Sequence, residues 1–214
     1  NWVWWDTPRI FTSASFSHLQ KFGKTDIGIS ANVLIEEGYR RLNAEHLGRV
    51  NLKIKHFSSK VEGLNYGINI NSGLTVKRDF VLWEDADSGA LKQDIKTAAE
   101  LHGDFLDIDP FISMKKNNRY QHDLRVRFQS SRNRLPDNPE NSSDAVSLYT
   151  EYQLWYRLFK FLDLTAGASG NYCNVNSNFF KDHYGYNIAG FTQFEVRPLN
   201  KLKAVIGLRV ENYN

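Results

Sequence analysis

The chain has 214 residues, and its 27 Lys and Arg against 24 Asp and Glu give a formal charge of +3. The mean hydropathy is −0.50, and no apolar run reaches the roughly 18–20 residues that a membrane helix needs, so helical membrane spans are excluded. The basic residues are not gathered with aromatics, which argues against a nucleic-acid partner, and the single Cys173 excludes an internal disulfide, a thiolate metal cluster or a redox pair.

Apolar and polar side chains alternate along most of the chain. Because a β-strand sends successive side chains to opposite faces, this period of two predicts strands. The alternating segments are 8–19, 27–35, 49–55, 64–76, 106–114, 122–128, 150–156, 162–168, 186–196 and 202–210. We therefore expect an all-β, antiparallel up-and-down meander of about ten strands.

The segment from Leu64 to Val76 carries the strongest pattern. Its even-numbered residues are apolar except for Ser72, and its odd-numbered residues are small or polar. The segment is longer than the five or six residues, roughly, that are usual for a strand in a soluble sandwich. A transmembrane strand needs about 9–11 residues, apolar toward lipid and polar toward the interior. The pattern thus favours strands of a larger transmembrane β-barrel.

The alternation is interrupted at one residue, at one turn and along one longer segment. Pro110 predicts a bulge or a locally unpaired position, because proline has no N–H for the sheet ladder. The residues Lys116-Asn117-Asn118 are typical of a tight turn. Between Glu84 and Gly103, the spacing of Leu91, Ile95 and the apolar residues up to Leu101 indicates a short helix.

The connections between predicted strands alternate in length. They are short near residues 21, 60, 117, 160 and 199, and extended near 40, 92, 138 and 179. Outer-membrane barrels have short periplasmic turns and long extracellular loops. Aromatic residues also cluster near the strand ends, where interfacial girdles lie. Both features favour a barrel over a soluble sandwich.

Seven runs in order resemble the barrel of Bacteroidetes-type TonB-dependent outer-membrane receptors: GISANVLIEEGYR, KVEGLNYGININSG, FVLWEDADSGALK, DIDPFISM, YTEYQLWYRLF, DHYGYNIAGFTQFEVRP and GLRVEN. The resemblance implies a barrel of about 22 strands whose interior holds an N-terminal plug. It also implies a location in the bacterial outer membrane and the import of a scarce nutrient with energy passed from TonB. The implied partners are the plug, TonB, outer-membrane lipid, a small nutrient ligand and a surface lipoprotein, with no cofactor and no enzymatic activity.

Relative to that family, residues 1–214 are expected to form a single barrel segment. The sequence shows no plug, TonB box or closing strand. Its first residues do not resemble a signal peptide, and its last residues fall within a strand pattern. We therefore expect an internal, early-to-middle portion of the barrel.

Two groups of loop residues are candidates for ligand binding. The longest connection contains Trp83, Glu84, Asp85 and Asp87, and another long connection contains Tyr39, Arg40 and Arg41. The alternative is that both segments are ordinary solvated loops without a ligand. The Asp-x-Asp-x-Gly spacing hints at a calcium loop, but the later bidentate Glu of that motif is absent. We expect no metal site there.

The charged residues of the polar faces are the second candidate site. Charge facing lipid would cost about 2–4 kcal/mol for Arg or Lys at mid-bilayer, so these residues are expected to face a wet or protein-filled interior. The candidates for contact with the plug are Lys53, Lys55, Arg125, Arg127 and Glu151. The alternative is that they line a hydrated interior.

Two other functions stay open on the sequence alone. One is a self-contained ten-stranded outer-membrane barrel acting as a hydrolase or channel, and the other is a soluble β-rich binding module. The adjacent Asp182 and His183 come with no identifiable nucleophile, so no catalytic residue is predicted.

Overall fold

The computed structural model describes residues 5–80, 82, 85, 87, 92–199 and 202–214. Its strands form one antiparallel sheet in the order β1 to β10, which confirms the predicted ten-stranded meander. The strands are β1 (Phe11–Phe22), β2 (Thr25–Glu36), β3 (Glu45–Phe57), β4 (Leu64–Asp79), β5 (Ala99–Lys116), β6 (Tyr120–Arg134), β7 (Ser143–Phe159), β8 (Leu162–Ser177), β9 (His183–Leu199) and β10 (Leu202–Tyr213).

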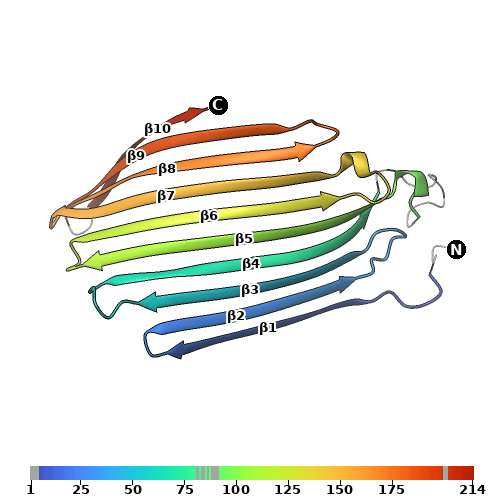
Figure 1. The fold of residues 1–214 in the computed structure, drawn as a ribbon, viewed down its shortest axis with the longest axis horizontal. Coiled ribbons are helices and arrows are strands. Elements are labelled where there is room, and N and C mark those ends of the chain that lie inside the picture. The colour runs from blue at the N-terminus through green and yellow to red at the C-terminus, as the bar shows by residue number, and fades with distance from the viewer. Residues whose placement is uncertain (1–4, 81, 83–84, 86, 88–91, 200–201) are drawn as a thin grey trace.

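The connections are sorted by length between the two ends of the sheet. Figure 1 shows the turns β1–β2, β3–β4, β5–β6 and β7–β8 at one end and the longer loops at the other. The β5–β6 turn contains Asn117 and Asn118 with φ of 52° and 47°, the left-handed conformation of a tight hairpin turn. The predicted segregation of short and long connections is therefore confirmed.

Strand pairing makes each face of the sheet continuous. On β4, Ile70 is paired with Leu52 of β3 and Ile108 of β5, while its neighbour Asn71 is paired with Asn51 and Asp107. Since paired residues point to the same side of a sheet, apolar side chains line up with apolar ones across the strands. We call the two sides the apolar face and the polar face.

The described residues of the sheet form no hydrophobic core of their own. Ala189, at 3% exposure, is the one buried hydrophobic residue within the described ranges. Large apolar side chains are exposed instead, with Leu74 at 68% and Phe16 at 61% exposure. In a soluble sandwich these residues would pack against a second layer, so the structure contradicts the soluble-module alternative in that form. Among the described residues, no helix is of the length and apolarity that would let it cross a membrane.

The region around residue 95 differs from the prediction. In place of a short helix it holds a single 3-10 turn, η2 (Ile95–Thr97), and β5 already begins at Ala99. The side chain of Asp94 accepts a hydrogen bond from the backbone N–H of Lys96, at 3.0 Å, and caps this turn. Leu91 lies outside the described residues. The helix prediction is wrong because Leu101 belongs to a strand, where pairing with Lys77 fixes an extended backbone.

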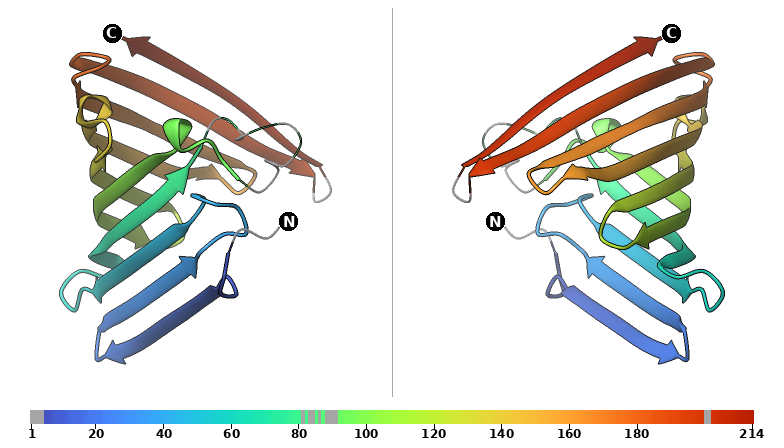
Figure 2. Two further views of the ribbon diagram at one scale, coloured as in Figure 1. Left: turned by 90° about the vertical axis from the view of Figure 1, so that its right-hand side faces the viewer. Right: turned by 90° about the vertical axis from the view of Figure 1, so that its left-hand side faces the viewer.

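The strands reach further toward the long-loop end than the alternation predicted. The extended connection expected near residue 138, between the alternating segments 122–128 and 150–156, is shortened by the end of β6 and the start of β7 and holds a 3-10 turn, η3 (Pro139–Asn141). The sheet is curved and open (Figure 2), with β1 and β10 as its two edges and no pairing between them in the described strands. This differs from a closed ten-stranded barrel, in which the first and last strands pair.

Candidate functional site

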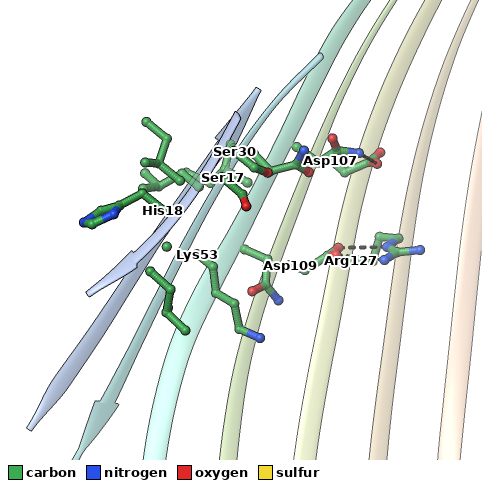
Figure 3. Close-up of a pocket in the computed structure, with 15 residues that line it drawn as sticks. Ser17, His18, Ser30, Lys53, Asp107, Asp109 and Arg127 are labelled. Atoms are coloured by element: carbon green, nitrogen blue, oxygen red, sulfur yellow. Dashed lines mark hydrogen bonds and ion pairs between the residues drawn. The ribbon is translucent and has the colours of Figure 1, made fainter. Parts of the chain in front are cut away.

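A cavity of about 720 Å³ lies on the polar face. Its polar lining comes from six neighbouring strands, β1 to β6: Ser17, Ser30, Asn51, Lys53, Asn69, Asn71, Asp107, Asp109 and Arg127. In Figure 3 the labelled side chains of Ser17, Ser30, Lys53, Asp107, Asp109 and Arg127 lie on one side of the strands, and His18 points away. One cavity can extend over six adjacent strands only where the sheet is hollowed, so the polar face is the concave one.

Asp107 leaves one hydrogen-bond acceptor open in this cavity. The amide Nδ2 of Asn71 donates to Asp107 Oδ2 at 3.1 Å. The other carboxylate oxygen, Oδ1, is buried and has no hydrogen-bond partner. A buried acceptor without a partner costs about 1–3 kcal/mol, so the Asp107 carboxylate is only half satisfied within the sheet.

Asp109 and Arg127 form a bidentate ion pair on the concave face. The guanidinium donates through Nε and Nη2 to the two carboxylate oxygens, both at 2.8 Å. The pair lies beside Pro110, where the pairing of β5 with β6 is interrupted between Ile108 and Phe111. The predicted unpaired position at Pro110 is thus confirmed. Since proline supplies no N–H, the side-chain pair links the two strands where the backbone ladder does not.

A second cavity of about 440 Å³ continues the first toward β7. Asn69, Asp109 and Arg127 line both cavities, and Phe111, Arg125 and Tyr149 are added in the second. The Tyr149 hydroxyl donates to Glu151 Oε2 at 2.7 Å. The concave face therefore offers a continuous polar wall from β1 to β7.

The five residues predicted to face a plug all lie on this concave side but differ in their contacts. Arg127 is held by Asp109, and Glu151 accepts from Tyr149. Lys55 Nζ lies 4.8 Å from the centroid of the Phe57 ring. Lys53, Lys55 and Arg125 take part in none of the ion pairs formed by the described residues. These three cations are therefore available to an external carboxylate.

Glycines keep the aromatic rings of this face flat against the wall. A Cβ added at Gly67 would lie 2.8 Å from Cζ of Phe111, and one added at Gly73 would lie 2.6 Å from Cε1 of Phe105. The same relation holds between Gly167 and Phe191. Because each ring occupies the space that a side chain would fill, it does not stand up into the cavity.

The loop candidates lie apart from the cavity, at the long-loop end. The Arg40 guanidinium carbon lies 5.2 Å from the Tyr39 ring centroid and 5.9 Å from that of Phe80, and Arg41 Nη2 donates to the carbonyl oxygen of Gln93 at 2.9 Å. The first long loop thus packs against the one that follows β4. The backbone N–H of Asp87 donates to Asp85 Oδ1 at 2.8 Å, while Trp83 and Glu84 lie outside the described residues. No group of three His, Cys, Asp or Glu within those residues is placed to hold a metal ion.

Sequence reasoning missed the residues that form most of the cavity. Asp107, Asp109, Asn69 and Asn71 are ordinary members of the alternating pattern, and their polar character alone did not separate them from other wall residues. The signal lies in the register, which brings the two carboxylates of β5 beside the two amides of β4.

No protein-family model and no curated protein matches the sequence. Solved structures do match the fold. The ferric yersiniabactin uptake receptor FyuA from Yersinia pestis aligns with a TM-score of 0.71 over 96% of this chain and 39% of its own, at 12% identity. The ferric-catecholate import receptor Fiu from E. coli K12, in its open form, gives 0.72 over 97% and 45%, at 10% identity.

The siderophore receptor PiuA from Acinetobacter baumannii aligns with a TM-score of 0.65 over 95% of this chain and 44% of its own, at 8% identity. The chain thus spans less than half the length of each of these receptors. At such low identities the likeness establishes the fold, which is that of part of a receptor barrel.

Proposed function

We propose that this chain forms part of the barrel wall of a TonB-dependent receptor in a bacterial outer membrane, which binds a scarce nutrient and imports it. The observation that carries the proposal is the division of one open sheet into an exposed apolar face and a hollowed polar face. The apolar face needs lipid to cover it, since the described residues form no core. The polar face suits a wet or protein-filled interior.

A ferric chelate is the nutrient class that the comparisons favour. The printed descriptions of the three similar structures are of receptors for ferric yersiniabactin, ferric catecholate and a siderophore. Assignment to the Bacteroidetes type rests on the ordered sequence runs alone. The loop residues Tyr39, Arg40, Arg41, Trp83, Glu84, Asp85 and Asp87 stay candidates for contact with the ligand or with a surface lipoprotein.

The nutrient proposal is tested by uptake. The gene that encodes this chain is deleted, and growth under iron limitation is measured with a panel of ferric chelates, before and after complementation. We expect growth on one chelate class to require both the gene and TonB. Unchanged growth and unchanged uptake of labelled chelate across the panel would exclude the siderophore class, and uptake without TonB would exclude the receptor class.

We further propose that the concave face contacts the plug through its free groups rather than through its paired ones. Lys53, Lys55 and Arg125 are suited to plug carboxylates, because they lie on the concave side and form no ion pair among the described residues. Arg127 and Glu151 would instead hold the wall in shape, since each already has a partner.

Charge reversal tests this division of roles. In the full-length receptor, Lys53→Glu with Arg125→Glu should lower uptake about tenfold, which corresponds to roughly 1.4 kcal/mol of lost attraction, and should raise ion conductance in planar bilayers. The charge-keeping pair Lys53→Arg with Arg125→Lys is the control and should retain uptake. Equal conductance and uptake in both double variants would contradict plug contact at these two positions.

A further inference from the structure

A third cavity lies on the concave face, at the end of the sheet where the short turns are (Figure 1). Its volume is about 440 Å³, which falls within the roughly 300–1,000 Å³ of small-molecule sites. We call it the short-turn pocket. Next to Arg157 it is lined by six side chains from β5, β6, β7 and the β5–β6 turn: Lys115, Asn118, Gln121, Asp123, Gln153 and Trp155.

The indole ring of Trp155 is held with one face toward this pocket. Since side chains alternate between the two faces of a strand, its neighbours on the concave side of β7 are Gln153 and Arg157. The guanidinium carbon of Arg157 lies over the ring, 5.1 Å from its centroid. Arg157 is itself fixed, because its Nε donates at 2.9 Å to Asp163, a carboxylate with 5% exposure. The other face of the ring is therefore turned toward Gln153 and forms a flat apolar platform.

The polar groups around this platform are mostly unused within the sheet. Among the hydrogen bonds and ion pairs of the described residues, none involves the side chains of Lys115, Asn118 or Gln153. Asp123 accepts through Oδ2 from Nε2 of Gln121 at 2.8 Å, which orients the carboxylate and leaves Oδ1 open. Two free amides, an ammonium group and a carboxylate oxygen thus converge on one aromatic ring.

The chemistry of the short-turn pocket suits a neutral ring that carries hydroxyl groups. An amide offers both donors and acceptors and a carboxylate offers acceptors, so together they match hydroxyl groups on adjacent carbons. The negative face of an indole ring attracts the C–H groups on one side of a sugar ring. An ion is not favoured, because Lys115 is balanced by Asp123 and Arg157 is already paired. An aromatic ligand would use the platform and leave the surrounding donors and acceptors without partners.

We propose that the short-turn pocket binds a saccharide ring stacked on Trp155. The amides of Gln153 and Asn118 and the open oxygen of Asp123 hydrogen-bond its hydroxyl groups, and Arg157 holds the indole from behind. The inference goes beyond the proposed import function and takes from it only the periplasmic side of the short turns. A sugar ring reaches this end either on a solute that leaves the interior or on the glycan of the cell wall, and the probes below distinguish the two sources.

The test measures saccharide binding to the purified full-length receptor by calorimetric titration. The neutral probes are a glucose tetrasaccharide of the maltose type and an N-acetylated chitin tetrasaccharide, and an acidic galacturonate tetrasaccharide is the charged probe. We expect Trp155→Ala and Gln153→Ala each to weaken binding of a neutral probe at least about tenfold, or roughly 1.4 kcal/mol. Gln129→Ala is the matched control and should equal the wild type, because Gln129 shares the concave face but pairs with Ser147, away from the pocket.

The probes also identify the source and the failure. Tighter binding of the chitin probe assigns the ligand to the cell-wall glycan, and tighter binding of the glucose probe assigns it to a solute in the interior. Preference for the acidic probe, equal affinity in the wild type and Trp155→Ala, or no binding to the folded receptor would overturn the inference. If Trp155→Ala folds poorly by heat-modifiable mobility, Trp155→Phe should retain binding and Gln153→Ala should still lose it. Because this binding needs neither uptake nor TonB, its absence refutes the inference alone, whereas uptake without TonB refutes the proposed function.

Discussion

The two faces of the sheet are completed in different ways. On the concave face, polar side chains pair with each other across strands, as Asn71 does with Asp107 and Arg127 with Asp109. On the apolar face, Ile70, Leu74 and their neighbours lie on the same strands but meet no second layer of protein. The concave face thus carries its own network of hydrogen bonds and ion pairs, whereas the apolar face depends on the surrounding medium to cover it. Both faces are exposed in the isolated sheet, so exposure does not distinguish them; the chemistry of the exposed side chains does.

The largest expected effect comes from placing the same charge on each face. Ile70→Arg should lower the free energy of unfolding by about 2–4 kcal/mol in lipid vesicles, because the guanidinium would face hydrocarbon. Asn71→Arg, one residue away, should change it by less than about 1 kcal/mol, since its side chain faces the cavity and Asp107. Denaturant titration of the refolded protein in vesicles measures both. Equal losses would mean that the apolar face does not meet lipid.

The next effect concerns how closely neighbouring strands approach. Gly67→Ala puts a Cβ against the Ile54 carbonyl oxygen and the Phe111 ring, whereas the space around Gly48 on the adjacent strand is open. Overpacking of this kind costs about 1–3 kcal/mol, so Gly67→Ala should unfold at lower denaturant than wild type and Gly48→Ala should not. The same pair of variants reports on the cavity, because a displaced Phe111 ring should reduce conductance through a plug-free receptor. Wild-type stability for Gly67→Ala would contradict the close packing of ring and glycine.

The smallest effect tests whether the Asp109–Arg127 pair compensates for Pro110. Pro110→Val restores a backbone donor toward β6 and should stabilise the sheet by about 0.5–1.5 kcal/mol. Arg127→Gln should destabilise it by about 1 kcal/mol in the wild type, because the pair is half exposed, and by less in the Pro110→Val background. A double-mutant cycle on unfolding free energies gives the coupling. Strict additivity would show that the ion pair and the missing ladder bond act independently.

The amino-acid pattern was sufficient for much of the fold because its information is local. Strand number, the face of each residue and the ends at which turns and loops lie all follow from a period of two and from turn residues such as Asn117 and Asn118. It was insufficient between residues 95 and 101, where helical spacing and strand pairing competed and pairing with β4 fixed the backbone from Ala99 onward.

For the candidate site, the sequence predicted that five residues share one face of the sheet: Lys53, Lys55, Arg125, Arg127 and Glu151. It did not predict which side chains each of them contacts. Whether Arg127 is free or bound depends on which residue of β5 stands beside it, and a shift in register would give it another partner. The same holds for Asp107, whose open oxygen becomes visible only once Asn71 is seen to hold the other.

By itself the sequence determined that this chain would be a two-sided, ten-stranded ribbon, because alternation is written residue by residue. Tertiary structure alone decided which carboxylate meets which cation and where the sheet is hollowed into a cavity. Those properties come from pairing residues distant in the chain, and no local pattern encodes the register between them.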